Sequence, residues 1–181
     1  MHSWRVLLLP WLDQKQLYDQ YDFSEPWDGP NNRRLLDQRP RTYALHDRND
    51  EPGSVTNYLV VMGPQTLWPG SEPSDRPFGS PNEILIVENV GADVHWTEPR
   101  DLSLDSMNFD LAASPADGIS SSYLPAAVAL GDGSIRRLPP EKISPDELRD
   151  LLSGRGNLET ALKDAAFALK DGRDRPKKPT Q

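Results

Sequence analysis

The dipeptide Asp132-Gly133 constrains the fold more than any other feature of this sequence. It lies between the apolar run 126–130 and the segment 134–138, the pattern of a β-hairpin with a two-residue turn. A type I′ turn requires positive φ at both central residues, which Asp and Gly tolerate. The sequence therefore predicts an antiparallel strand pair here. We expect Asp132 to be a turn residue, and a role as a catalytic acid is the less favoured alternative.

Further apolar runs predict more strands. Residues 57–62 and 84–87 are nearly continuous apolar segments, which suit strands buried on both faces. His95-Trp96 predicts a third, shorter strand. Proline accounts for 18 of the 181 residues, against a usual share of roughly 5%. This abundance predicts long irregular connections, above all over residues 22–57 and 63–82.

Helices are expected at both ends of the chain. Apolar residues at helical spacing predict a helix over residues 3–20 with a break near Pro10. The two tryptophans of this segment, Trp4 and Trp11, are expected to anchor a core. Together with the strands, these helices indicate an α+β fold.

The C-terminal helices have clear sequence signals. Ser144, Pro145 and Glu147 have the spacing of a capping box with proline at the first helical position. Leu148, Leu151 and Leu152 are expected on the buried face, and Gly154 at the end. A second helix is predicted from Asn157 as N-cap to Gly172, and its apolar stripe consists of Leu158, Leu162, Ala165 and Leu169.

Composition excludes several classes of function. The net charge of −8 argues against nucleic acid as the main partner, because an acidic protein repels phosphate. The basic end of the chain, residues 170–181, is interpreted as a solvated terminus. The chain has no cysteine, so disulfides and thiolate chemistry are excluded. No stretch has the length of a membrane span or the pattern of a signal peptide.

No catalytic, cofactor-binding or metal-ligating set can be assigned, and no cofactor is expected. The three histidines have no metal-ligand spacing. One cluster is rich in polar side chains and consists of Glu88, Asp93, His95, Glu98, Arg100, Asp101 and Asp105. It is either an acid–base or metal site, or a network in which Arg100 and carboxylates pin a loop that leaves the sheet. We favour the network.

Tryptophans suggest a second candidate surface. Trp27 and Trp68 lie in loops rich in proline and glycine, so they are the better candidates for exposed tryptophans. Exposed indoles form platforms for carbohydrates or peptides. The alternative, which we favour, is that these rings pack the loops.

An ordered set of motifs resembles one bacterial family of unknown function. Members combine a prepilin-type N-terminus with a C-terminal H-x(9)-D-G motif, and the family is also catalogued as extracellular solute-binding proteins. The matching segments are 3–10, 17–20, 25–28, 56–59, 61–64, 96–102, 118–121, 131–138 and 144–152.

The resemblance implies a pseudopilin-like head. Such a head has a small antiparallel sheet, long proline-rich loops, an N-terminal helix and C-terminal helices. It implies a non-enzymatic surface or assembly module of a secretion or pilus-type system, with a protein partner at the cell envelope. The alternative is an extracellular module that binds a sugar, a peptide or a cation.

This chain departs from the family pattern. The prepilin segment is missing, Ser122 stands where the motif has histidine, and Leu45 replaces an expected cysteine. The resemblance implies a location at the envelope or outside the cell, although this chain shows no signal or transmembrane segment. We expect one head domain over residues 1–155, a helical extension over 156–172 and a disordered basic tail over 173–181.

Overall fold

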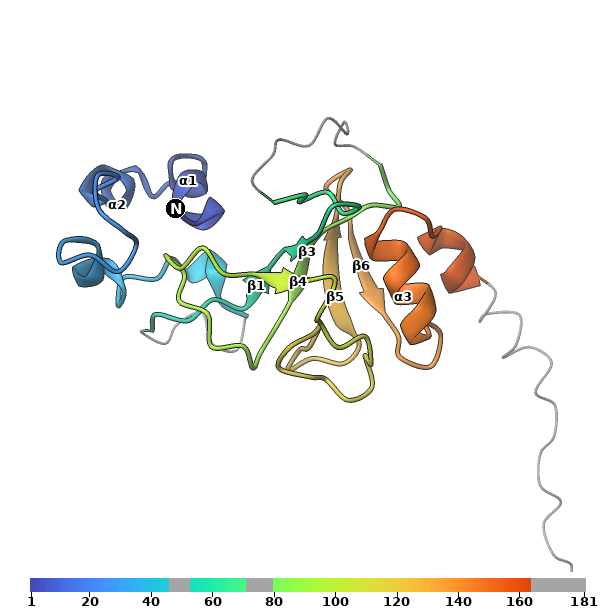
Figure 1. Cartoon of the computed structure of the whole chain (residues 1–181). Coiled ribbons are helices and arrows are strands. Elements are labelled where there is room, and N and C mark those ends of the chain that lie inside the picture. The colour runs from blue at the N-terminus through green and yellow to red at the C-terminus, as the bar shows by residue number, and fades with distance from the viewer. Residues whose placement is uncertain (46–52, 71–79, 164–181) are drawn as a thin grey trace, which may run out of the picture.

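Two small sheets form the centre of the fold. The computed structural model describes residues 1–45, 53–70 and 80–163 (Figure 1). The larger sheet is antiparallel, with strand order β1-β3-β5-β6. Its strands are β1 (Tyr58–Leu59), β3 (Ile84–Glu88), β5 (Ala126–Leu130) and β6 (Ile135–Leu138). A parallel pair consists of β2 (Val61–Met62) and β4 (Leu102–Ser103). The predicted α+β class with a small antiparallel sheet is therefore confirmed.

The β5–β6 hairpin is confirmed, but its predicted turn type is wrong. Of the two turn residues, only Gly133 is left-handed, with a φ of 84°. The Gly133 amide donates to the Leu130 carbonyl, and the Leu130 amide donates to Ser134. This is a three-residue loop in which glycine follows a tight turn. Asp132 is exposed and accepts hydrogen bonds from the amide and hydroxyl of Ser134, so it fills the predicted turn role.

The single strand predicted over residues 57–62 is wrong, because two strands lie there. At Val60 the chain passes from one sheet to the other: β1 pairs with β3, and β2 pairs with β4. The Val60 amide donates to the Asp101 side chain at 2.9 Å instead of to a neighbouring strand. The strand predicted at His95-Trp96 is also absent. His95 forms only an isolated bridge with Val55.

One hydrophobic core lies between the larger sheet and α3 (Pro145–Leu152). Leu148, Leu151 and Leu152 are buried in it, as predicted. The Ser144 capping box is present, and Gly154 follows α3 with a φ of 71°.

A further helical stretch, 158–163, adds Leu158 to the same core, and the Asn157 side chain accepts from the Thr160 amide. The first turn of the predicted second helix is thus confirmed. Ala165, Leu169, Gly172 and the tail lie outside the described residues.

A second hydrophobic core gathers the N-terminal segments. These are α1 (Trp4–Leu8), the 3₁₀ turns η1 (Leu9–Leu12), η2 (Asn32–Leu35) and η3 (Arg41–Tyr43), and α2 (Lys15–Gln20). The core consists of Val6, Leu9, Leu17, Tyr21, Leu35, Tyr43 and Trp96. Figure 1 shows these segments at one end of the molecule and α3 at the other, with the sheet between them.

The N-terminal helix breaks at Pro10 as predicted, but its predicted buried face is wrong. Trp11 is 77% exposed, and Leu7 and Leu8 are 48% and 39% exposed. The helical period does not continue, because α1 ends at Leu8 and the chain tightens into a 3₁₀ turn at Leu9. The face that is buried carries Arg5, Val6 and Leu9.

Within residues 1–45, 53–70 and 80–163, no helix combines the length and the apolar character that crossing a bilayer requires.

Replacing the N-cap of α3 tests the C-terminal part of this fold. Ser144→Ala removes the acceptor for the Glu147 amide and the partner of its carboxylate. The free energy of unfolding should fall by about 1 kcal/mol. Urea denaturation measures the change. Ser122→Ala, at an exposed serine outside any helix, is the control and should leave the midpoint unchanged. Equal effects of the two substitutions would contradict the capping role.

Candidate functional site

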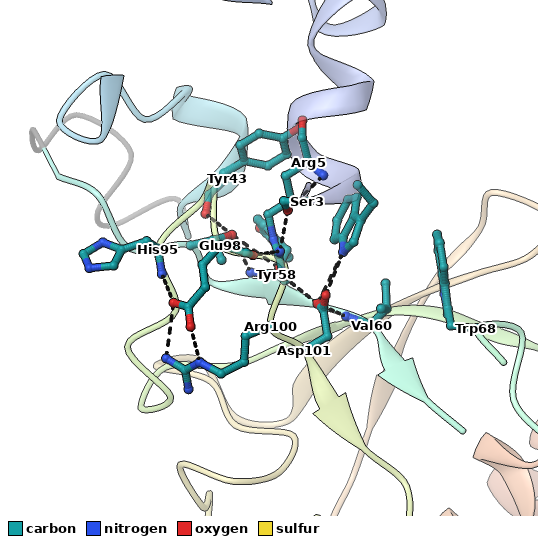
Figure 2. A network of polar contacts seen from close by, with 12 residues as sticks. Ser3, Arg5, Tyr43, Tyr58, Val60, Trp68, His95, Glu98, Arg100 and Asp101 are labelled. Carbon is teal, nitrogen blue, oxygen red and sulfur yellow. Dashed lines mark hydrogen bonds and ion pairs between the residues drawn. The ribbon is translucent and has the colours of Figure 1, made fainter. Parts of the chain in front are cut away.

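A fully buried arginine lies where the two cores meet. Arg5 has an exposed fraction of 0%. Its Nε donates to the Tyr58 carbonyl at 3.0 Å, and its Nη1 donates to the Ser3 hydroxyl at 2.9 Å and to the Glu98 carbonyl at 3.3 Å. Its Nη2 donates to Asp101 at 2.5 Å (Figure 2). A buried guanidinium requires this number of acceptors, because each unpaired N–H group costs free energy.

Asp101 completes the network from the other side. Its Oδ1 accepts from Arg5 and from the Val60 amide, and the Trp4 indole donates to Oδ2 at 3.2 Å. The side chain is only 4% exposed. Burial lowers the pKa of Arg5 and raises the pKa of Asp101, and the attraction between the two charges opposes both shifts. The carboxylate is thus held by three donors from α1 and the β1–β2 junction.

Local sequence explains how α1 presents Arg5. Ser3 is the N-cap of α1, and its hydroxyl oxygen accepts hydrogen bonds from the amide and from the guanidinium of Arg5. From η3 in the N-terminal core, the Tyr43 hydroxyl donates to the Arg5 carbonyl at 2.6 Å. Burial raises the pKa of Tyr43, which keeps this hydroxyl protonated as a donor. Ser3, Arg5, Tyr43 and Asp101 therefore join the N-terminal core to the sheet.

Glu98 and Arg100 form a second, more exposed pair. Arg100 Nε donates to Glu98 Oε1 at 2.6 Å, and its remaining nitrogens reach the carbonyls of Ala92 and Asp93 at 3.1 and 3.2 Å. Glu98 Oε2 also accepts the His95 amide at 3.2 Å. Arg100 thus links three points of one loop, the arrangement that the favoured interpretation of the polar cluster predicts.

Burial alone would raise the pKa of Glu98. The hydrogen bonds from Arg100 and from the His95 amide outweigh that effect, so its pKa lies below the usual 4.5.

The remaining candidates lie apart from this network or on its border. His95 packs its ring against Trp27, with 5.9 Å between the centroids. Trp96 is fully buried, donates to the Leu36 carbonyl and stacks on Tyr43, so it belongs to the N-terminal core. Glu88 is buried in β3 and accepts the Ala127 amide at 2.8 Å. The structure therefore does not bring Glu88 and His95 into one acid–base centre with Asp101.

A groove of about 280 Å³ borders the network on one side. Its lining is mostly apolar and includes Trp4, Leu7, Met62, Trp68 and Pro99, together with Asp101. The rings of Trp4 and Trp68 lie 6.1 Å apart. Sequence reasoning selected Trp68 as a candidate, but it placed Trp4 in the core and did not predict that the two rings lie together.

Sequence reasoning also missed Arg5, the central residue of the network. The available signal was a single arginine inside the apolar run 4–9, since an arginine among buried neighbours needs a carboxylate partner. Across the described part of the chain, no group of three or more histidine, cysteine, aspartate or glutamate side chains has the arrangement of a metal site.

Comparison with known proteins agrees with the resemblance predicted from the sequence. Over residues 1–76 the chain is similar to the family described as "Protein of unknown function (DUF1559)". This is the predicted family, which is also catalogued as solute-binding. The matched range contains Arg5, Tyr43 and Tyr58 of the network but ends before Asp101. No curated protein and no solved structure matches the chain.

Breaking the buried pair of Arg5 and Asp101 should destabilise the folded protein strongly. Arg5→Met leaves the Asp101 carboxylate buried without its cation, and we expect a loss of about 3–5 kcal/mol in the free energy of unfolding. Adding Asp101→Leu to Arg5→Met should cost less than the sum of the two single effects, because neither charge then remains unpaired. Urea denaturation of the four proteins measures the coupling.

The matched control for the buried pair is Arg100→Met, which breaks the Arg100–Glu98 pair. The Arg100 side chain is 50% exposed, so the loss should stay within about 1 kcal/mol. Strictly additive effects of Arg5→Met and Asp101→Leu would show that the pair contributes no coupling.

The lowered pKa of Glu98 predicts an acid-dependent contribution to stability. The folded pKa lies below that of the unfolded chain, so this contribution is complete above the unfolded pKa and disappears as pH falls through the folded one. Glu98→Gln should flatten this part of the stability curve between about pH 7 and about pH 3. Denaturation midpoints across that range provide the measurement. The exposed Glu141→Gln is the control, and an identical curve for Glu98→Gln and wild type would contradict the assignment.

Proposed function

We propose that this chain is a non-enzymatic surface or assembly module that binds a protein partner at the cell envelope, in the manner of a pseudopilin-like head. One observation carries the proposal. Leu7, Leu8 and Trp11 expose large apolar side chains on α1 and η1, although the chain as a whole is polar, with a mean hydropathy of −0.67. Apolar residues that gather on one exposed element mark interaction surfaces.

The charge of the same segment supports a docking role. Within residues 1–12, Arg5 is the sole residue of the Asp, Glu, Lys and Arg types, and Asp101 pairs with it inside the protein. The rest of the chain is acidic, as the net charge of −8 shows. A partner that approaches Trp11 and Leu8 therefore meets a neutral apolar surface, which lowers the desolvation cost of association.

The use of the polar side chains supports binding over catalysis. Asp101, Glu98 and Glu88, the acidic candidates closest to the sheet, all accept hydrogen bonds from main-chain amides. A general acid or base needs a carboxyl group within reach of a substrate proton. These three groups hold loops and strand ends in place through main-chain hydrogen bonds, which is a structural role.

Site-specific crosslinking in the bacterial cell tests the proposal. A photo-reactive phenylalanine derivative at position 11 should crosslink to a component of an envelope assembly system, identified by mass spectrometry and reproduced with that component purified. Position 135 provides the control, because Ile135 is 61% exposed but lies on β6 in the larger sheet. Equal crosslinking at the two positions, or none at position 11, would refute an N-terminal docking surface.

A second candidate function is solute binding, which the groove between Trp4 and Trp68 favours. Small-molecule sites are concave and mostly apolar, and many are larger than this groove. Its volume of about 280 Å³ suits a small solute. The catalogued label of the similar family agrees with this candidate.

A further inference from the structure

We infer that the groove beside the Arg5–Asp101 pair binds an uncharged apolar solute with a ring, and not a sugar, a peptide or a cation. This inference rests on the solute-binding form of the proposed function and names its ligand class. The groove is formed by α1 on one side and by the Met62–Trp68 segment on the other. Trp68 lies on the Val60 side of the network (Figure 2).

The Asp101 carboxylate at the groove is neutralised by Arg5, which argues against a cation. Among the described residues that line the groove, Asp101 is the one carboxylate, and its Oδ1 already accepts hydrogen bonds from Arg5 and from the Val60 amide. A divalent ion at this carboxylate would compete with Arg5, and it could take the place of Arg5 only if it displaced a guanidinium without exposed surface. That exchange would leave a buried cation unpaired.

The indole N–H donors at the groove are also engaged within the protein, which argues against sugars and peptides. The Trp4 indole N–H donates to Asp101, and the Trp68 indole N–H donates to the Leu85 carbonyl at 2.9 Å. Ser3 is 1% exposed, and its oxygen accepts from Arg5. Recognition of hydroxyl groups or peptide carbonyls requires free donors and acceptors, because an unpaired polar group of the ligand loses its bonds to water.

The groove therefore offers mainly aromatic faces, aliphatic side chains and a thioether. Trp4 and Trp68 supply the rings, Leu7 and Pro99 the aliphatic contacts, and Met62 a polarisable side chain that adapts to the shape of a ligand. Such surfaces bind rings through apolar burial and offset or edge-to-face contact. An uncharged ligand matches a lining in which the carboxylate of Asp101 is already paired with Arg5.

Neighbouring leucines on α1 provide a matched pair of variants. Leu7 lines the groove and Leu8 does not, while both are exposed, at 48% and 39%. Leu7→Glu places a charge at the groove, and Leu8→Glu places the same charge one residue away. Because both side chains are exposed, the two variants should keep the wild-type denaturation midpoint.

The experiment is a titration of the full chain with benzyl alcohol as an uncharged ring probe, followed by NMR of the indole N–H groups. The signals of Trp4 and Trp68 should shift saturably, and that of the buried Trp96 should not. Leu7→Glu should weaken binding by at least about tenfold and Leu8→Glu by less than about twofold, where tenfold corresponds to about 1.4 kcal/mol. Glucose and Ca²⁺ should leave both signals in place.

Three results would overturn the inference: no saturable shift at Trp4 and Trp68, equal weakening by the two variants, or a saturable response of these signals to glucose or Ca²⁺. The crosslinking at position 11 does not involve the groove. Failure of the ligand assignment and failure of the docking surface are therefore distinguishable.

Discussion

The buried pair of Arg5 and Asp101 is the interaction on which the arrangement of this molecule depends. A guanidinium without exposed surface is stable only when acceptors surround it, and these come from the N-cap of α1, from β1 and from the loop before β4. The same carboxylate accepts a hydrogen bond from the Val60 amide. The apolar run 57–62 is therefore divided at Val60 between the two sheets. One ion pair thereby joins the N-terminal core to the sheet and sets the point where the chain changes sheets.

The elements with local signals are the ones that the sequence predicts well. The hairpin at Asp132-Gly133 and the capping box at Ser144 depend on residues close in the chain, and both are present. The failures involve partners far apart in sequence. The apolar stripe of residues 4–12 predicts a buried face with Trp11, but the hydrogen bonds of Arg5, 96 residues before Asp101, rotate that face to the surface.

The candidate residues divide in the same way. The favoured Arg100 interpretation needs only neighbours within one loop, and the structure has the predicted contacts. The sequence indicated Asp101 and Trp68 as candidate residues, but it did not predict that Asp101 pairs with Arg5 or that Trp68 lies beside Trp4. Their meeting depends on tertiary packing between residues 1–9 and the segments around 60–68 and 99–101, which no periodicity reveals.

These observations connect architecture with the proposed functions. Because Arg5 and Asp101 neutralise each other inside the protein, the surface of α1 and η1 is left apolar and uncharged. The exposed side chains of Leu8 and Trp11 form the proposed docking surface, and the groove of Trp4 and Trp68 forms the proposed ligand site. Both proposals therefore depend on one buried ion pair that holds α1 in place.

Native-state hydrogen exchange of Arg5→Met tests this central role most directly. If the pair joins the two cores, amides of the N-terminal core, such as those of Leu17 and Tyr21, should exchange at a lower free energy than in wild type. Amides of β3 and β5 should keep a higher free energy of opening, because the core between the sheet and α3 does not contain Arg5. An equal loss of protection in both cores, or none in either, would contradict this account.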